Sequence, residues 1–467
     1  MKRPALLLAA CLLSACTVGP DYVRPDAPEQ PAFRYQPENW KAAQPADTLP
    51  RGAWWTVFND PQLSALAERA LRANQSVIAA DARYRQAQAV ARQARAGLYP
   101  SLDVGLSAGR GRNPGATTTT RTNQLDFDAG WEPDLWGRVS RSIEQGEALA
   151  QSGAADAESA RLSVLGALAQ NYFSLRVADA QAKLLGDTII GYAQSLKLTQ
   201  NRYAAGVAAR TDVVQAQTQL KSAQAQLADL GLQRAQLENA IAVLAGEAPQ
   251  AFSIARDATL VAVPAIPPLL PSTLLERRPD IAAQERQVAA ANARIGVAQA
   301  AFYPSFNLSG TLGWRASSFA DLLSAPTRFW SLGAAAVQLL FDGGSRQAVE
   351  DQARAAYDNQ VALYRGTVLA AFQEVEDNLA ALKFLDEEIG FQEEAVAAAK
   401  LSVEMTLNRY KAGTVGFLEV ISVQTIALSN ERTLATLKGR RLNAAVLLVK
   451  ALGGGWSAQS PAANPGN

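Results

Sequence analysis

The chain has 467 residues, with 44 lysines and arginines against 43 aspartates and glutamates, a net charge of +1 and no histidine. The lack of histidine removes the usual proton shuttle and the commonest metal ligand, and the only cysteines, Cys11 and Cys16, lie in the first sixteen residues. Both facts argue against a Cys/His metal site or a cysteine nucleophile, and the balanced charge argues against nucleic acid as a partner. We therefore expect no metal, no cofactor and no enzyme activity, although a carboxylate- or serine-based enzyme remains formally open.

Residues 1–15 have the pattern of a secretion signal, with two basic residues before a short apolar run over 6–13. That run is too short to cross a bilayer as a helix, which takes about 20 residues. The Leu-Ser-Ala-Cys sequence that ends at Cys16 is typical of a bacterial lipoprotein box, so we expect cleavage to leave a lipid-modified, palmitate-bearing Cys16 as the first residue. Cys11 fits the same pattern only loosely. Thr17, in place of aspartate, permits sorting to the outer membrane in lipoproteins of this type.

The rest of the chain divides into an arm, two similar halves, a linker and a tail. The arm is predicted over 16–60, a Pro-rich linker over 246–271 and a disordered tail over 453–467. The first half, 61–245, is predicted to hold a helix over 61–97, strands over 99–109 and 123–132, and helices over 137–203 and 211–244. The second half, 272–452, is predicted to hold a helix to about 300, strands near 303–314 and 330–341, and helices over 345–410 and 417–452.

The two halves share sequence as well as the order of their elements. Residues 300–306 (AAFYPSF) echo 96–102 (AGLYPSL), and residues 406–413 (TLNRYKAG) echo 199–206 (TQNRYAAG), at a spacing of about 205 residues. Repeats of this length are not solenoid units, whose periods are about 20–50 residues. The chain is therefore predicted to be pseudo-symmetric and of mixed α and β structure, with a duplicated αββαα plan; the strands themselves indicate a membrane protein.

The predicted strands alternate between apolar and polar residues. In the first strand, Leu102, Val104 and Leu106 alternate with Asp103 and Ser107. Strands of about ten residues with this alternation match a transmembrane barrel that is apolar toward lipid and polar toward its lumen, whereas a soluble sheet with one buried face is the alternative. The lipoprotein signal favours the barrel, as do tryptophans near strand ends, which resemble an aromatic girdle: Trp131, Trp314 and Trp330.

Four strands cannot close a barrel, and open strand edges are not tolerated in hydrocarbon. Two copies would give eight strands with an interior filled by side chains. Three copies would give twelve strands and leave a lumen, so we expect a homotrimer with a shared 12-stranded barrel.

The predicted helices are far longer than those of globular proteins. A helix over 137–203 would be a rod of roughly 100 Å at 1.5 Å per residue. Heptad repeats support coiled-coil packing of 211–244 and 417–452, and Arg234 and Arg441 interrupt the same heptad position in the two halves. We expect these helices to form a long tunnel that continues from the barrel.

Several motifs together resemble the outer-membrane efflux proteins of the TolC/OprM type, and within them the NodT-like lipoprotein branch of RND-type multidrug efflux systems. The motifs are the mature start at 16–22 (CTVGPDY), the run at 274–281 (LLERRPDI), 293–296 (ARIG), 303–305 (YPS) and 340–344 (LFDGG). The resemblance covers essentially the whole mature chain. It implies a trimeric barrel with a periplasmic α-helical tunnel, a periplasmic adaptor, an inner-membrane pump that supplies the energy, and no enzyme activity. Proline and acid in the 274–281 run suit the first turn of a helix, and we interpret that run as structural.

The candidate periplasmic gate lies at the helix–helix turns of the two halves. By the resemblance, acidic residues at the second-half tip ring the closed entrance, and Glu419 falls on such a position, whereas Ser422 stands where related channels can carry a second acid. Three Glu419 carboxylates around one axis would favour cations. Asp212 and Glu419 can also be read as acids that complement a helix N-terminus. Further gate candidates are Arg210, Thr211, Tyr203 and Tyr410.

The leading functional prediction is a passive exit duct for drugs or small toxic compounds, lipid-anchored and inserted in the bacterial outer membrane, extending into the periplasm. A duct for protein secretion and a non-channel coiled-coil spacer are the alternatives. The amphipathic strands argue against a spacer, which has no use for them.

Overall fold

The computed structural model describes residues 17–28, 30, 32–35, 52–112, 114–115, 117–264 and 278–454. The predicted signal peptide, Cys16, most of the arm after residue 35, the end of the linker and the tail from residue 455 lie outside the described residues.

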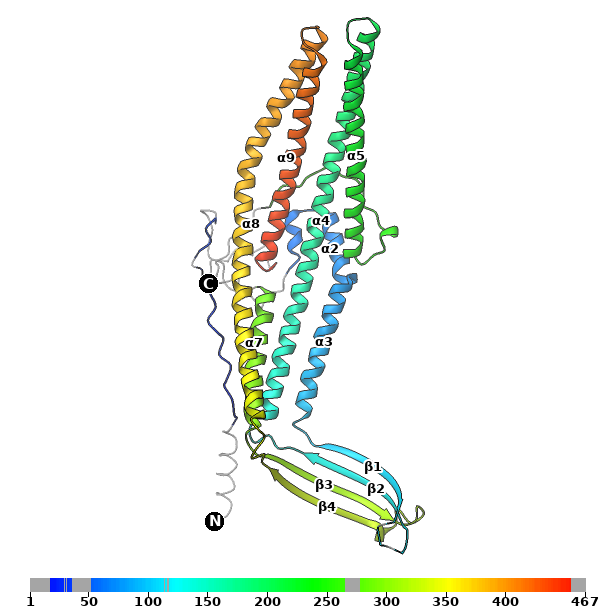
Figure 1. Cartoon of the computed structure of the whole chain (residues 1–467), viewed down its shortest axis with the longest axis vertical. Helices are drawn as coiled ribbons and strands as arrows, with labels where there is room; N and C mark the ends of the chain where they lie inside the picture. Colours follow the sequence, from blue (N-terminus) through cyan, green and yellow to red (C-terminus); the bar gives the residue numbers. More distant parts are fainter. Residues whose placement is uncertain are drawn as a thin grey trace, which may run out of the picture. The chain divides into compact units, whose positions relative to one another are not determined.

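The described chain contains long helices and one sheet, in the predicted order (Figure 1). The helices are α2 (Pro61–Ala73), α3 (Gln75–Ala96), α4 (Arg138–Ala204), α5 (Arg210–Leu244), α7 (Pro279–Ala300), α8 (Ser345–Lys411) and α9 (Phe417–Ala451), with short 3-10 turns η1 (Trp54–Phe58), η2 (Pro249–Ala251) and η3 (Ala325–Thr327). The strands are β1 (Ser101–Gly111), β2 (Thr120–Trp131), β3 (Ser305–Ala316) and β4 (Arg328–Val337). In the part of the chain that is described, no helix combines the length and apolar character needed to cross a membrane.

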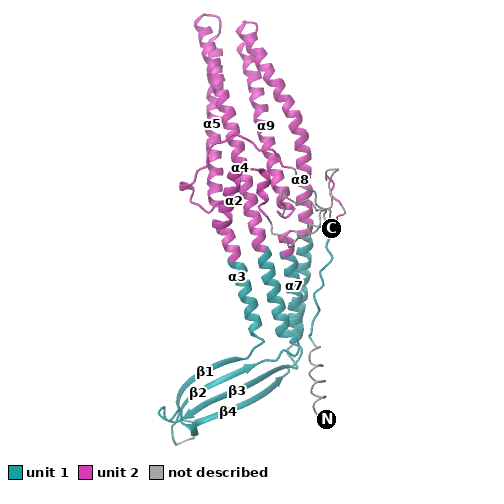
Figure 2. Cartoon of the chain, turned by 180° about the vertical axis from the view of Figure 1, so that it is seen from behind, with its two compact units in different colours: residues 1–27, 82–155, 283–366 teal, residues 28–81, 156–282, 367–467 magenta. Residues whose placement is uncertain are grey.

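The chain folds into two compact units, and each takes segments from both halves (Figure 2). Unit 1 comprises Met1–Ala27, Ala82–Ala155 and Ala283–Gly366, and it holds the sheet. Unit 2 comprises Pro28–Asp81, Asp156–Ala282 and Thr367–Asn467, and it holds the two helical hairpins α4–α5 and α8–α9. The 67-residue helices α4 and α8 each contribute to both units, and each is about 100 Å long at 1.5 Å per residue.

The sheet of unit 1 is antiparallel, with the order β1-β2-β3-β4. Val104, Phe127, Leu312 and Trp330 are paired in succession across the four strands, so they share one face. All four side chains are exposed. The sheet thus carries an exposed apolar face, as the alternation predicted.

The opposite face of the sheet is polar. Asp103 pairs with Asp128, and Asp128 pairs with Thr311, whose hydroxyl donates to the Asp128 carboxylate at 2.6 Å. Arg315 donates to Gln124 at 2.8 Å on the same face. Like charges placed directly opposite each other destabilise a sheet, and water reduces their repulsion, so this face suits an aqueous environment.

The predicted single helix over 61–97 is wrong in one respect, because it breaks at Asn74. The Asn74 backbone is extended, and its side-chain oxygen accepts from the backbone N–H groups of Ser76 and Val77. Its side-chain amide donates to the carbonyl of Leu244 at 2.9 Å, where α5 ends. A residue that hydrogen-bonds nearby backbone competes with helix and favours caps, and Asn74 caps α3 while it ties the end of α2 to the end of α5.

The described residues of unit 2 include an extensive apolar core, built where η1 and α2 pack on α4, α5 and α9. The aromatic rings of Trp54, Phe58 and Phe173 are buried there, with ring centroids of Phe58 and Phe173 5.0 Å apart. The end of α5 also approaches α2 closely: Gly246 has φ +77°, and a Cβ on it would lie 2.3 Å from the carbonyl oxygen of Ala73. Glycine is required here by both conformation and space.

Candidate channel entrance at the helical tips

The two hairpin tips in unit 2 have the same backbone design. Helix α4 ends before Gly206, with φ +75°, and helix α8 ends before Gly413, with φ +77°. Next to each glycine, a backbone N–H returns to the last turn, from Val207 to Arg202 and from Thr414 to Arg409, both at 2.9–3.0 Å. Left-handed glycine with such return bonds ends a helix sharply, so the repeated NRYxAG sequence forms two matching tight turns.

The two acidic candidates lie in the first turn of the returning helices. Asp212 lies in α5 and Glu419 in α9, and the backbone N–H of each donates to the carbonyl three residues earlier, in Ala209 and Gly416. Glu419 is exposed and Asp212 partly so, and within the described residues neither carboxylate forms a hydrogen bond or ion pair. Negative charge at a helix N-terminus is favourable, which accounts for both acids without reference to a gate.

Tyr410 is the candidate that the fold places in a cluster. It is 3% exposed, and its carbonyl accepts from the Arg202 guanidinium at 2.7 Å. The same guanidinium lies 4.7 Å from the Tyr410 ring centroid, and the hydroxyl of Tyr410 is 3.3 Å from that of Thr199. The Phe417 ring packs on it at 5.4 Å. Tyr410 and Arg202 therefore link the two hairpins near their tips.

The remaining candidates do not join this cluster. Tyr203 is 47% exposed, and Arg210 and Thr211 are exposed at the start of α5. The residue that reaches Tyr410 is Arg202, one position before Tyr203. Because adjacent helix residues point about 100° apart, the repeated Arg-Tyr pair alone did not indicate which member faces the other hairpin.

An open groove of about 420 Å³ lies between the two hairpins. It is lined by residues of α4, α5 and α9, among them Tyr192, Val214, Thr218, Gln219, Leu418 and Ile421. Its lining mixes apolar side chains with uncharged polar ones.

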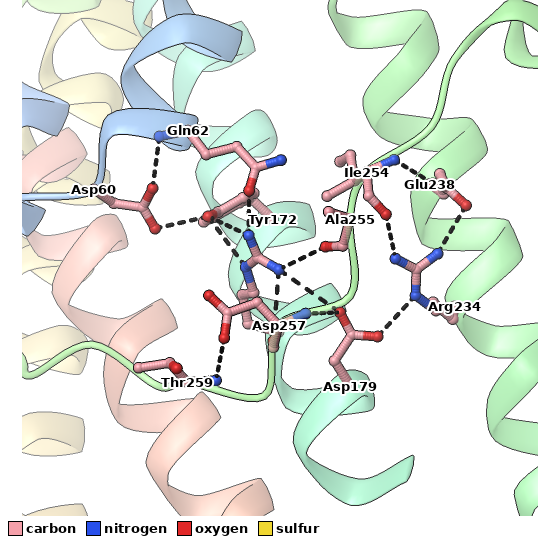
Figure 3. Close-up of polar contacts among 11 residues, drawn as sticks. Asp60, Gln62, Tyr172, Asp179, Arg234, Glu238, Ile254, Ala255, Asp257 and Thr259 are labelled. Atoms are coloured by element: carbon pink, nitrogen blue, oxygen red, sulfur yellow. Dashed lines mark hydrogen bonds and ion pairs between the residues drawn. The ribbon is translucent and has the colours of Figure 1, made fainter. Parts of the chain in front are cut away.

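A buried ion-pair network in unit 2 was not predicted as a site (Figure 3). Arg234 donates to Asp179 at 2.7 Å, to Glu238 at 2.9 Å and to the carbonyl of Ile254 at 2.6 Å. Arg176 donates to the carbonyl of Ala255 at 3.1 Å. The network thus fastens the linker after η2 onto α4 and α5.

The second half repeats one of these ion pairs. Arg441 pairs with Asp386 at 2.8 Å, and both partners lie 207 positions after Arg234 and Asp179. In the sequence, this repeated pair was indicated only by Arg234 and Arg441 at the same heptad position. Their aspartate partners lie on the neighbouring long helix, so only the fold identifies them.

The Arg-Pro-Asp motif at the start of α7 also has a structural role. Arg278 is 7% exposed and forms ion pairs with Asp280 at 2.5 Å and with Glu374 at 2.7 Å. It also donates to the carbonyl of Ala451 at 3.2 Å. Arg278 therefore fastens α7 to α8 and to the end of α9, in agreement with the structural interpretation.

Comparison with known proteins connects this architecture to one family. The family model of outer membrane efflux proteins matches residues 66–247 and 270–454. The chain is 33% identical to the pyoverdine export outer membrane protein OpmQ of Pseudomonas aeruginosa, over 98% of this chain and 97% of that protein. It is 32% identical to the solvent efflux pump outer membrane protein SrpC of Pseudomonas putida, over 98% and 99%.

A solved structure agrees with the sequence relatives. The outer-membrane channel OprN superposes with a TM-score of 0.85 at 31% identity, over 94% of this chain and all of that one. With the four-stranded sheet, the paired long hairpins and matches over both halves, the chain belongs to the outer membrane efflux protein family.

Proposed function

We propose that this protein is the outer-membrane exit duct of a tripartite efflux system, passive and trimeric, through which drugs or small toxic compounds leave the cell. The observation that carries the proposal is the open sheet of unit 1, with its exposed apolar face and its polar opposite face. An apolar outer face and a polar inner face are what a transmembrane barrel presents to lipid and to water.

The edges of the sheet require other copies of the chain. Within the described residues, β1 and β4 each pair on one side only, and unpaired backbone groups are costly in hydrocarbon. Pairing of β4 with β1 of the next copy satisfies both edges. Three copies of the four strands close a 12-stranded barrel with a lumen, whereas eight strands leave an interior that side chains fill.

The helices form the periplasmic part of the duct, and the hairpin tips face the partners. A periplasmic adaptor joins the tips to an inner-membrane RND-type pump, which supplies the energy. The cargoes named for OpmQ and SrpC are pyoverdine and solvent, which supports small compounds as the cargo of this duct.

Two further features belong to the same proposal. After removal of residues 1–15, a lipid-modified Cys16 anchors the N-terminus in the outer membrane. At the tips, Glu419 contributes one carboxylate per chain to a ring around the entrance, and Asp212, Arg210, Thr211, Tyr203 and Tyr410 shape its surroundings. Such a ring favours cations.

The test combines a channel measurement with an export measurement. Purified protein in a planar bilayer should give discrete, cation-preferring conductance steps. Cells that lack their own efflux channels, but carry a matching pump and adaptor, should accumulate less of an exported dye when this protein is expressed. Absence of conductance together with unchanged dye accumulation would refute the proposed duct.

A further inference from the structure

The residues directly after Cys16 are held on unit 1 by a set of contacts that we name the N-terminal seat: Arg141 on α4, and Asn292 and Gly296 on α7. Arg141 is 6% exposed, and its guanidinium donates to the carbonyls of Val18 at 3.3 Å and Gly19 at 3.1 Å. A buried charge needs partners to offset its lost hydration, and this one takes part of them from the N-terminal backbone.

Gly19 and Gly296 make the close approach possible. Gly19 has φ +103°, and a Cβ on it would lie 2.4 Å from the Cα of Gly296. A Cβ on Gly296 would lie 2.8 Å from the Cγ of Arg141. Only glycine fits at either position, so the sequence motifs around 16–22 and 293–296 are two sides of one contact.

Further bonds continue the attachment along the segment. Asn292, 5% exposed, donates to the carbonyl of Pro20 at 2.9 Å. The hydroxyl of Tyr22 donates to Glu285 at 2.9 Å, and Arg24 donates to the hydroxyl of Tyr364 at 3.3 Å. The extended segment therefore runs along α7 and α8 as a fixed strap (Figure 1, dark blue).

The first described residues lie where the sheet joins the helices. The Val18 N–H donates to the carbonyl of Trp136 at 3.1 Å, in the connection from β2 to α4. The Trp136 ring stacks on Tyr303 at 5.0 Å, in the connection from α7 to β3. Exposed apolar side chains lie near the strand ends that face the helices: Leu98, Tyr99, Trp131, Phe302, Leu340 and Phe341. Aromatic residues at strand ends mark the boundary between hydrocarbon and water.

We propose that the N-terminal seat is a positioning device for the lipid anchor: Arg141 and Gly296 fix the point at which the acylated N-terminus leaves the protein, at the periplasmic edge of the sheet. The inference rests on the proposed lipidation of Cys16. Acyl chains that start beside these strand ends enter the leaflet that the strand ends meet. The anchor and the barrel strands are therefore held at the same depth in the membrane. A lipid on a flexible tether would attach the protein to the membrane without fixing the depth of the strands.

The test measures amide hydrogen exchange at Val18 in the full trimer in lipid nanodiscs, with mass spectrometry of the same sample to establish whether Cys16 is lipidated. Arg141→Met should speed exchange at Val18 about tenfold or more, because hydrogen bonds to a charged group are among the stronger ones. The matched control is Arg138→Met, one turn earlier on α4, whose side chain is 45% exposed and pairs with Glu132. It should leave exchange at Val18 unchanged.

Gly296→Ala tests the same contact from the other helix, with Gly366→Ala as its control, since a Cβ on Gly366 meets nothing within 4 Å. Gly296→Ala should speed exchange at Val18 and lower the yield of outer-membrane trimer, while lipidation stays complete. Equal exchange at Val18 in wild type, Arg141→Met and Gly296→Ala would overturn the seat. An unlipidated Cys16 with protected Val18 would instead overturn the anchor while the seat remained, so the two failures are distinguishable.

Discussion

At the residue scale, single side chains decide where the long helices begin and end. Asp342, between β4 and α8, accepts from the backbone N–H groups of Gly344 and Arg346 at 3.1 Å and from the Arg346 guanidinium at 2.6 Å. Asn74 does the same between α2 and α3. In both places a short polar side chain supplies the partner that the first helical N–H groups lack.

Asp342 should make the stability of the start of α8 depend on pH. The hydrogen bonds from Arg346 lower the pKa of Asp342 below its usual 3.8. A lowered folded-state pKa stabilises the fold fully above about pH 4, and the contribution is lost as pH falls through the lower, folded value. Asp342→Asn should therefore reduce the thermal unfolding temperature at pH 7, and this effect should shrink progressively as the pH is lowered below about 4 and through the folded-state pKa. Asp358→Asn, an exposed α8 carboxylate without a hydrogen-bond or ion-pair partner among the described residues, should show no such pH-dependent difference.

Glu419 offers a second test on a single residue. If three Glu419 carboxylates surround the entrance, Glu419→Gln keeps the shape of the side chain but removes the charge. The cation preference of single channels in planar bilayers should then fall. Asp212→Asn should change it less, because Asp212 complements the start of α5. A cation preference of Glu419→Gln equal to that of wild type would leave Glu419 as a helix-terminus residue only.

At the element scale, the duplicated helices carry the same ion pair in two environments. The Arg234–Asp179 side chains are 11% and 2% exposed, whereas those of Arg441 and Asp386 are 35% and 63% exposed. In the first half the linker covers the pair and adds a bond to Ile254. The contribution of the same ion pair to stability thus depends on what packs over it.

Substituting Arg234 and Arg441 by methionine gives a matched pair of variants. Arg234→Met leaves Asp179 buried without its closest cation, which costs roughly 3–5 kcal/mol, whereas loss of an exposed pair costs about 0–1 kcal/mol. Arg234→Met should lower the thermal unfolding temperature clearly, and Arg441→Met hardly at all. The double variant Arg234→Met with Asp179→Leu should recover much of the loss, because an apolar pair often replaces a buried ion pair. Equal effects of the two single variants would contradict this difference.

At the scale of the whole molecule, the sheet is incomplete in one chain. Its apolar face remains exposed, with Leu102 at 71% and Leu332 at 80%, and its outer strands have one neighbour each among the described elements. The proposed trimer in lipid would account for both properties. A stable, folded monomer in detergent, observed by native mass spectrometry, would contradict the edge-strand argument.

Lysine substitutions on the two faces of β1 should distinguish the face that meets lipid from the face that meets the lumen. Leu106 pairs with Leu125 on the apolar face, and the next residue, Ser107, pairs with Gln124 on the polar face. Leu106→Lys should cost about 2–4 kcal/mol per chain if it meets the bilayer midplane and should reduce the trimer fraction in native mass spectra. Ser107→Lys, one position along the same strand, should leave it nearly unchanged. Equal trimer fractions for both variants would contradict the assignment of the apolar face to lipid and the polar face to the lumen.

The sequence alone determined the kind and order of the elements, because strand alternation, heptads and glycine turns are local patterns with distinct periods. It placed helices α4, α5, α8 and α9 within a residue or two and the strands within a few residues. The duplication and the motifs also indicated the family. Glu419 and Asp212 were placed correctly at helix starts, since an acid in a first turn is a local signal.

The tertiary structure decided the contacts between distant segments. The break at Asn74 is fixed by the carbonyl of Leu244, which lies 170 residues away. The buried partner of Arg234, the choice of Arg202 over Tyr203 at Tyr410, and the Arg141 seat for the N-terminus likewise depend on which helices lie together. The spacing of apolar residues shows which face of a helix or strand is buried, but not which other element packs against it. These polar contacts depend on both.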